Sequence, residues 1–326
     1  MTEQLQALCE RFILNRDILK DEFRWENQLL FPVCASSFCE KDMTADPARL
    51  QLAKQLLESR TGFFSNFRSN VKLPMISMMA MDAEPSVRLE NTLAIYDILK
   101  NYFSGGSYTA LIAAIISGMA PVSEADRLAA RGKKLYGMMK DAHPFLTGGE
   151  DSVFAVLMAF SEKEDQALFD DMEECYSIAR KLASDKNSAQ TLSHVLALYD
   201  GTPKDKCDKV TALYNALSAK RRKYSRYFEM SVLGTLAMAA PDSASVVQDM
   251  IEVDDFLDGK PGYGAFGIDK KTRLMHAAML VSTLHKPNVT TSAALTSTLA
   301  TIAAQQAAMC AIIASTSAAS ASAAST

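Results

Sequence analysis

The stretch "FAVLMAFSEKEDQALFDDMEECYSIARKL" at residues 154–182 contains the pattern that decides the fold. It opens with a run of small and medium-sized apolar residues, which suits a helix packed closely against its neighbours. Ser161 and Glu164 follow at the spacing of a capping box, a signal for the start of a second helix. That helix has apolar residues three and four positions apart along one face: Leu168, Met172, Cys175, Ile178 and Leu182. The stretch therefore predicts an inner helix, a short capped turn and an amphipathic outer helix.

The same design recurs along the chain with a period of about 40 residues, as in arrays of helical hairpins. Related apolar runs begin at residues 76, 112, 154, 193, 233 and 276, so successive starts are 36, 42, 39, 40 and 43 residues apart by subtraction. A single hairpin cannot bury its apolar stripe, but stacked hairpins cover one another. No segment shows the alternating β-branched pattern of a strand. The sequence thus predicts an all-α fold, a tandem helical-hairpin array of the α-solenoid or α/α-superhelix kind.

This pattern divides the chain into four regions. Residues 1–70 are expected to form an N-terminal cap of two helices, the second starting at Asp46 and Pro47. Trp25 and the apolar segment "LLFPVCASSF" between those helices are interpreted as docking residues. Residues 71–286 are predicted to form the repeat array. Residues 287–314 are predicted to be an uncharged, Ala-rich packing helix, and residues 315–326 a disordered tail.

The C-terminal region has no charged residue from residue 287 onward. Its apolar length would suit a membrane-spanning helix. However, Gln305 and Gln306 lie in its middle, and desolvating two amides in lipid is costly. We therefore expect no membrane span and a helix packed on the array. Because that helix would carry no charge on its outer face, self-association through residues 287–314 is a further expectation.

Composition and charge narrow the class of protein. The net charge is −4 and the isoelectric point is near 5.7, which disfavours a broad affinity for nucleic acid or anionic membranes. The N-terminal "MTEQLQALCERF" lacks the basic and apolar regions of a secretory signal, so a cytoplasmic location is expected. The six cysteines are scattered among helix-forming residues and are expected to be reduced and packed as small apolar groups.

The stretch "GKPGYGAFGIDKKTRLMHAAML" at residues 259–280 has the G-x-G-x-x-G spacing of a dinucleotide-binding turn. The residues before it resemble an acidic amphipathic helix rather than a strand, so we interpret it as a joint between two helices, with Asp269 capping the second. A glycine-rich loop can still offer backbone amides to a ligand. The candidate ligand-binding residues are therefore Tyr263, Gly264, Arg273 and His276. The preferred alternative is an ordered loop whose histidine is buried and hydrogen-bonded to the backbone.

Other functional patterns are weak. The four histidines and six cysteines do not have the spacing of a metal site, so no metal is expected. Acidic runs at residues 162–174 and 252–258 resemble solvated helix faces, with a cation site shared between adjacent units as the alternative. The basic run from Lys220 to Arg226 could suit RNA, but an inter-helix joint is preferred in an acidic protein, and nucleic acid is not expected. No nucleophile motif is present, so the catalytic residues stay unknown and no cofactor is expected.

Three segments carry a resemblance to a known family: "NFRSNVKLPMISMMAMD", "GYGAFGIDKKTRLMHAAML" and "AAQQAAMCAIIA". Together they are similar to a bacterial domain-of-unknown-function family, number 4003, of helical proteins with an Ala/Ser-rich C-terminal tail. The resemblance covers nearly the whole chain, although its motifs are packing patterns. It implies a bacterial cytosolic protein with this architecture, and it implies no activity.

The sequence favours a non-catalytic protein-interaction or scaffold module that offers the surface of a helical array to a protein partner. This hypothesis rests on the repeats and on the lack of a catalytic constellation. The rival is an enzyme or a small-molecule-binding protein with a site at the loop and helix of residues 262–276. The residues leave open whether the chain is an enzyme.

Overall fold

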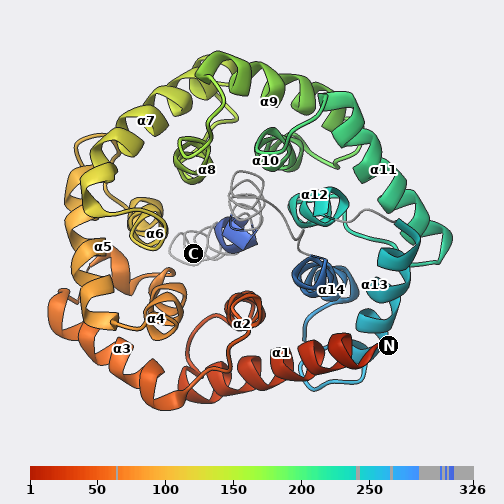
Figure 1. The fold of residues 1–326 in the computed structure, drawn as a ribbon, viewed down its shortest axis with the longest axis horizontal. Coiled ribbons are helices and arrows are strands. Elements are labelled where there is room, and N and C mark those ends of the chain that lie inside the picture. The colour runs from red at the N-terminus through yellow and green to blue at the C-terminus, as the bar shows by residue number, and fades with distance from the viewer. Residues whose placement is uncertain are drawn as a thin grey trace, which may run out of the picture. The chain divides into compact units, whose positions relative to one another are not determined.

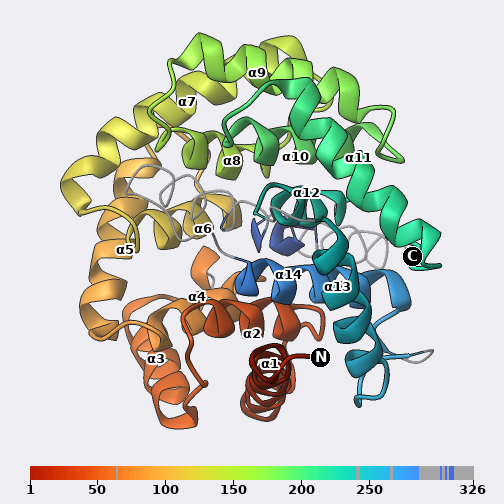
Figure 2. The ribbon, with the colours of Figure 1, turned by 45° about the vertical axis from the view of Figure 1, so that its right-hand side comes forward.

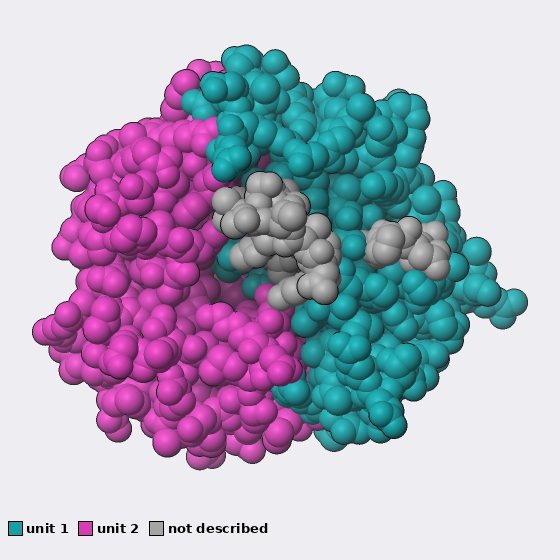
Figure 3. Space-filling view, in the orientation of Figure 1, with its two compact units in different colours: residues 1–11, 161–308 teal, residues 12–160, 309–326 magenta. Residues whose placement is uncertain are grey.

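The computed structural model describes residues 1–63, 65–239, 243–264, 267–285, 302, 305, 306 and 308–311. The chain forms two compact units (Figure 3): unit 1 contains residues 1–11 and 161–308, and unit 2 contains residues 12–160 and 309–326. Over the described residues the regular elements are helices. Extended pairing in this part of the chain is limited to one bridge between Tyr263 and Ile268.

Unit 2 is built from two layers of helices (Figure 1). The outer layer holds α3 (Pro47–Arg60), α5 (Pro85–Leu99) and α7 (Ala125–Ala142), which pack side by side in chain order. The inner layer holds α2 (Leu30–Glu40), α4 (Lys72–Ala80), α6 (Ser107–Ile116) and α8 (Asp151–Met158). The long helix α1 (Glu3–Glu22) enters this unit from Phe12 onward, and short 3-10 helices, η1 (Asn66–Arg68) and η2 (Val122–Glu124), lie in two connections. The inner helices are buried on nearly all sides, whereas the outer helices bury one stripe.

Unit 1 repeats the two-layer arrangement (Figure 2). Its outer helices are α9 (Asp165–Ala179), α11 (Pro203–Ala219) and α13 (Ser243–Asp258), and its inner helices are α10 (Lys186–Ala197), α12 (Met230–Ala239) and α14 (Lys270–Leu284). In the predicted stripe of α9, Leu168, Met172 and Cys175 are buried. The periodicity of the sequence therefore marks the side of the helix that faces the inner layer.

Most outer helices pack most extensively against the inner helix that follows them, and α11 packs equally against α12 and α9. The connection within a tightly packed pair therefore runs from an outer helix to the next inner helix. These connections often contain glycine, such as Gly105 with its φ of +49°. These neighbouring helix pairs form a tandem hairpin array. Each tight hairpin is an outer helix with the inner helix that follows it, so the predicted unit of an inner helix and the following outer helix is wrong. The predicted fold class is confirmed.

The helix starts predicted at Asp46 and Asp269 are confirmed, and Thr202 caps a third helix in the same way. The side chains of Asp46, Thr202 and Asp269 accept hydrogen bonds from the backbone amides of the first turns of α3, α11 and α14. The capping box predicted at Ser161 and Glu164 is wrong. Ser161 Oγ accepts the amide hydrogen of Lys163 at 3.2 Å, and α9 begins at Asp165 with no side-chain cap from Glu164. The local turn at Ser161 therefore replaces the box.

The N-terminal region differs from the prediction in two ways. It contains three α-helices instead of two, because the segment "LLFPVCASSF" folds as the buried helix α2. Pro32 is compatible with this helix because it lies in its first turn. Trp25, predicted to dock on the array, is instead 91% exposed in the turn between α1 and α2.

The predicted packing helix at residues 287–314 lies mostly outside the described residues. Where the backbone is described, at residues 302, 305, 306 and 308–311, it is helical, and the side chains of Gln305, Gln306, Met309 and Cys310 are buried. The predicted tail at residues 315–326 lies outside the described residues. Within the described part of the chain, no helix combines the length and apolar character needed to cross a membrane.

At Gly132 the outer helix α7 lies very close to the inner helix α8. An ideal Cβ at this position of α7 would lie 2.6 Å from Val156 Cγ2 and 3.1 Å from Val156 Cα on α8. Gly132→Ala should therefore destabilise the protein by about 1–3 kcal/mol through overpacking, despite a gain in helix propensity. At Gly137, on the same helix, no atom lies within 4 Å of the added Cβ. Gly137→Ala should stabilise by up to about 1 kcal/mol. Urea unfolding measures both, and equal effects of the two substitutions would contradict the close approach.

Candidate functional site

The glycine-rich loop after α13 is a tight joint between two helices. Gly262 has a φ of +89° and Gly264 a φ of +122°, conformations that favour glycine. The Ile268 amide donates to the Gly262 carbonyl at 2.9 Å, and the Gly264 amide donates to the Ile268 carbonyl at 3.0 Å. The loop leaves the helix α13 and ends where Asp269 caps α14. The glycines thus turn the chain between two helices, as the sequence predicts.

The structure brings two of the four candidate ligand-binding residues together. Tyr263 Oη lies 3.0 Å from Nδ1 of His276, and the two rings meet edge to face with centroids 5.8 Å apart. His276 is fully buried. At this ring nitrogen its partner is the hydroxyl of Tyr263, whereas the alternative interpretation expected a backbone group. Gly264, the third candidate, uses its amide within the loop.

Arg273, the fourth candidate, belongs to a buried ion-pair network. Its Nε lies 2.7 Å from Asp254 Oδ1, and Arg222 Nη1 lies 2.9 Å from Asp254 Oδ2. Arg273 also pairs with Asp258, and both Asp254 and Arg273 are buried. Paired charges of this kind are costly to break, because removing one partner leaves the other uncompensated. These contacts join α13, α14 and the connection before α12, which supports a structural role for the Arg273 guanidinium.

The basic run from Lys220 to Arg226 contributes to the same joint. Arg222 pairs with Asp255 at 2.6 Å as well as with Asp254. Arg226 donates hydrogen bonds to the backbone carbonyl oxygens of Lys181 and Leu182. Two of the cations that could contact RNA phosphates are therefore bound within unit 1.

Unit 2 contains a buried acid at the start of α8. Asp151 Oδ2 accepts a hydrogen bond from the Gly148 amide at 2.7 Å. Burial raises the pKa of Asp151 to about 7. The hydrogen bond from Gly148 acts to lower this pKa, and the negative charge of Glu150 raises it to a smaller extent. Burial also raises the pKa of Tyr108 and of Cys310, and the charge of Asp151 adds to both shifts. Perturbed acids mark functional sites in many proteins, but here the carboxyl group also serves the start of the helix. Among the described residues, no cluster of three or more His, Cys, Asp or Glu side chains could hold a metal ion.

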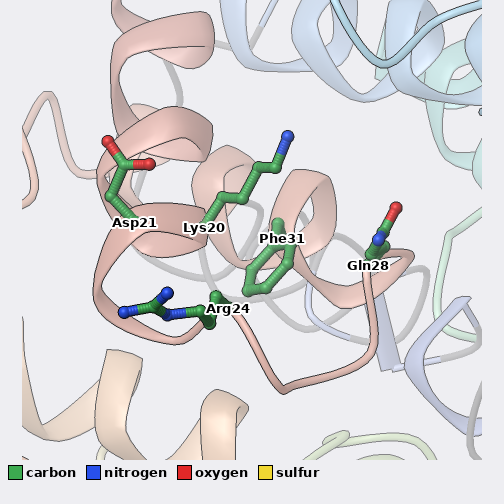
Figure 4. A pocket seen from close by; sticks show the side chains of 5 residues that line it. All are labelled: Lys20, Asp21, Arg24, Gln28 and Phe31. Carbon is green, nitrogen blue, oxygen red and sulfur yellow. The ribbon is translucent and has the colours of Figure 1, made fainter.

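A surface pocket of about 320 Å³ lies in unit 2 where α1 ends and α2 begins (Figure 4). The residues that line it are Lys20, Asp21, Arg24, Gln28 and Phe31. The buried ring of Phe31 is surrounded by the four polar side chains, which are exposed. In Figure 4 the Lys20 amine lies above the ring and the Gln28 amide to its right, whereas the Asp21 carboxylate and the Arg24 guanidinium lie to the left. Across the part of the chain that is described, neither Lys20 nor Gln28 is engaged in an ion pair or a side-chain hydrogen bond. Both are therefore available to a ligand.

Trp25 lies beside this pocket. The guanidinium carbon of Arg24 is 6.0 Å from the centroid of the Trp25 ring, so Arg24 connects the exposed indole to the pocket. Exposed tryptophan next to arginine is a combination enriched where proteins bind one another. The sequence analysis did not identify Lys20, Arg24 and Gln28. The signal that could have identified them is the single tryptophan within the polar turn "EFRWENQ" at residues 22–28.

The fold and the site define an all-α hairpin protein with a charged surface pocket. The chain belongs to the family described as "Protein of unknown function (DUF4003)", whose model matches residues 15–307. The resemblance to family 4003 is thereby confirmed. No curated protein and no solved structure matches the chain.

The buried network predicts a stability cost at Arg273. Arg273→Met should lower the free energy of unfolding by about 3 kcal/mol, because it leaves the buried Asp254 with one cation fewer. Lys270→Met changes an exposed residue of the same helix and should alter stability by no more than about 0.5 kcal/mol. Chemical denaturation of both variants provides the comparison. An Arg273→Met protein as stable as the unmodified chain would point to a role in binding instead.

Asp151 predicts a dependence of stability on pH. Its folded-state pKa of about 7 is raised above the ordinary value of 3.8, so between these values the folded chain keeps a proton that the unfolded chain has lost. Stability should therefore fall as the pH rises from 4 to 7, by at most about 1.4 kcal/mol per pH unit from this group. Asp151→Asn removes the ionisation and should gain stability relative to the unmodified protein over that window. Unfolding free energies measured from pH 4 to pH 8 give this difference, with the exposed Asp141→Asn as the control for an amide substitution. If the difference in unfolding free energy between Asp151→Asn and the unmodified protein does not change with pH, the raised pKa of Asp151 is ruled out.

Proposed function

We propose that this protein is a non-catalytic interaction module that binds an acidic segment of a protein partner at the turn between α1 and α2. The observation that carries the proposal is the exposed Trp25 beside the pocket of Lys20, Arg24, Gln28 and Phe31. The family resemblance and the absence of a membrane-spanning helix among the described residues support a bacterial, cytoplasmic setting as part of the same proposal.

The composition of the pocket favours a protein segment over an enclosed small molecule. Sites for small molecules are mostly apolar and bury most of the ligand. Four of the five residues that line this pocket are polar and exposed, and Trp25 lies outside it. A ligand that covers the indole and also enters the pocket must extend beyond it. Burying an exposed aromatic side chain of about 200 Å² stabilises a complex by roughly 5 kcal/mol before the cost of association is subtracted.

The charges of the rim favour an acidic partner. The Lys20 amine and the Gln28 amide both line the pocket and can donate hydrogen bonds to a carboxylate that enters it away from Asp21. On the other side, Asp21 repels a second carboxylate, which fixes where the acid of the partner would lie. The apolar floor of Phe31 and the Trp25 ring suit an apolar residue next to that acid. The chain as a whole has a net charge of −4, so attraction of an acidic segment depends on these local cations.

The single tryptophan of the chain makes the proposal directly measurable. A peptide of alternating Glu and Leu should shift the emission of Trp25 to shorter wavelength in a saturable way, because the indole becomes buried. A peptide of alternating Lys and Leu should not. Lys20→Glu should weaken the binding of the acidic peptide about tenfold or more, since a charge-assisted hydrogen bond contributes about 1.5–3 kcal/mol. Lys209→Glu makes the same charge change at an exposed lysine of α11 and should leave binding unchanged.

A second measurement tests how much Trp25 contributes to peptide binding. Fluorescence anisotropy of the labelled acidic peptide should show at least about 30-fold weaker binding to Trp25→Ala, the loss typical of a hot-spot residue. Phe145→Ala, a change at a fully exposed aromatic residue in the turn before α8, is the matched control. Equal binding of both peptides, or saturable binding of benzoate with the same sensitivity to Lys20→Glu, would overturn the proposal of an acidic protein segment.

A further inference from the structure

Two buried cysteines face each other between neighbouring outer helices of unit 1. Cys175 lies on α9 and Cys207 on α11, and these helices pack side by side. Neither residue is exposed to solvent. The Cys207 thiol donates to the backbone carbonyl of Cys175 with an Sγ to oxygen distance of 3.8 Å. The two sulfur atoms therefore lie in the same small volume between the helices.

A cluster of charges surrounds this pair. Lys206 Nζ lies 2.6 and 2.8 Å from the two carboxylate oxygens of Asp171, and Lys163 Nζ lies 3.3 Å from one of them. The Cys175 thiol approaches the same carboxylate at 3.6 Å. Lys163 Nζ also lies 3.9 Å from the exposed Asp200, so the buried Lys206 ammonium is the cation that acts on both thiols. Such surroundings favour a thiolate.

The two thiols have different chemical characters. Hydrogen bonding with the Cys175 side chain lowers the pKa of Cys207, and the positive charge of Lys206 lowers it further, against the effect of burial. The same hydrogen bond, together with burial, raises the pKa of Cys175. The Cys175 thiol donates to the Asp171 carboxylate, which keeps Cys175 protonated, whereas Cys207 is next to the buried Lys206 in the chain. Cys207 is accordingly the better nucleophile, and Cys175 is the neighbouring thiol that can react with it in a second step.

We propose that Cys175 and Cys207 form a redox-active pair that a hydroperoxide converts to a disulfide linking α9 to α11. In the first step the Cys207 thiolate attacks the terminal peroxide oxygen, which breaks the O–O bond, releases an alcohol or water, and leaves a sulfenic acid on Cys207. In the second step the Cys175 sulfur attacks the Cys207 sulfur and displaces water. Two thiols are oxidised, one peroxide is reduced, and a dithiol reductant reverses the reaction.

The buried cysteines of unit 2 lie in different surroundings from this pair. Cys34 lies beside Ser77, and Cys39 accepts a hydrogen bond from Asn15. Burial raises the pKa of Cys34 to about 12, so it stays a thiol at neutral pH. Hydrogen peroxide is little larger than water, and it can reach the buried pair when α9 and α11 separate transiently. We therefore expect a reaction slower than that of an exposed thiolate but selective for this pair.

The test uses the full chain treated with hydrogen peroxide, with added glutathione as an internal reference for an accessible thiol. After denaturation and alkylation with N-ethylmaleimide, mass spectrometry should show that the number of alkylated thiols falls from six to four, because two are consumed. Peptide mapping should find a bond between Cys175 and Cys207, and dithiothreitol should restore six. Cys34→Ser, a change at a buried cysteine of the other unit, should still lose two thiols.

Two variants separate the roles of the cysteines. In Cys175→Ser the sulfenic acid on Cys207 should persist and react with dimedone. In Cys207→Ser, neither a disulfide nor a dimedone adduct on Cys175 should form. Retention of all six thiols after prolonged treatment with excess peroxide, continued well beyond full oxidation of the glutathione, would overturn the proposal. A bond to another cysteine, or a dimedone adduct on Cys175 in place of Cys207, would overturn it equally. These outcomes do not depend on peptide binding at Trp25, so the two proposals can fail separately.

Discussion

The constraint on which this structure depends is that a helical hairpin exposes an apolar stripe that it cannot bury by itself. Within each unit a second layer of helices buries these apolar stripes. Inner helices such as α6 are covered on almost every side. Inner and outer helices can approach closely only where one of them lacks a side chain. Gly132 on α7 meets Val156 of α8 in this way, and within the inner layer Gly234 on α12 meets Leu192 of α10. The spacing of the layers is thus set by a few small residues.

The same stacking explains where buried charges occur. Asp254 is held by arginines from α14 and from the connection before α12, while Asp171 on α9 is held by Lys206 on α11 and by Lys163. In both clusters the partners come from neighbouring hairpins. A buried pair adds little net stability over an apolar contact, but a shift that separates its members is strongly unfavourable. These clusters therefore fix how one hairpin is aligned with the next, which apolar stripes alone specify poorly.

The sequence predicted those features that depend on neighbouring residues along the chain. The caps at Asp46 and Asp269 and the first three residues of the α9 stripe are local, and all of these are found. Features that depend on a distant helix were not predicted. The sequence placed Arg273 in a candidate ligand site. Its partner is instead Asp254, which lies on another helix, and the spacing of residues along the chain does not reveal that contact. Lys20 lies in the last turn of α1 and Arg24 in the turn that follows, and in the sequence the two resemble ordinary solvated residues. They line a pocket only because Phe31 of α2 packs beneath them.

Exposure of an aromatic residue is weak evidence for binding by itself, because single exposed apolar side chains are common on soluble proteins. Phe63 and Phe145 are also exposed in turns of unit 2. Trp25 differs in its surroundings, since the guanidinium of Arg24 lies over its ring and also lines the pocket above Phe31. Arg24 can interact with the indole and with an incoming acid at once, so the two parts of the surface would act on one ligand together. This shared residue, more than the exposure, makes the α1–α2 turn the strongest candidate for a binding surface.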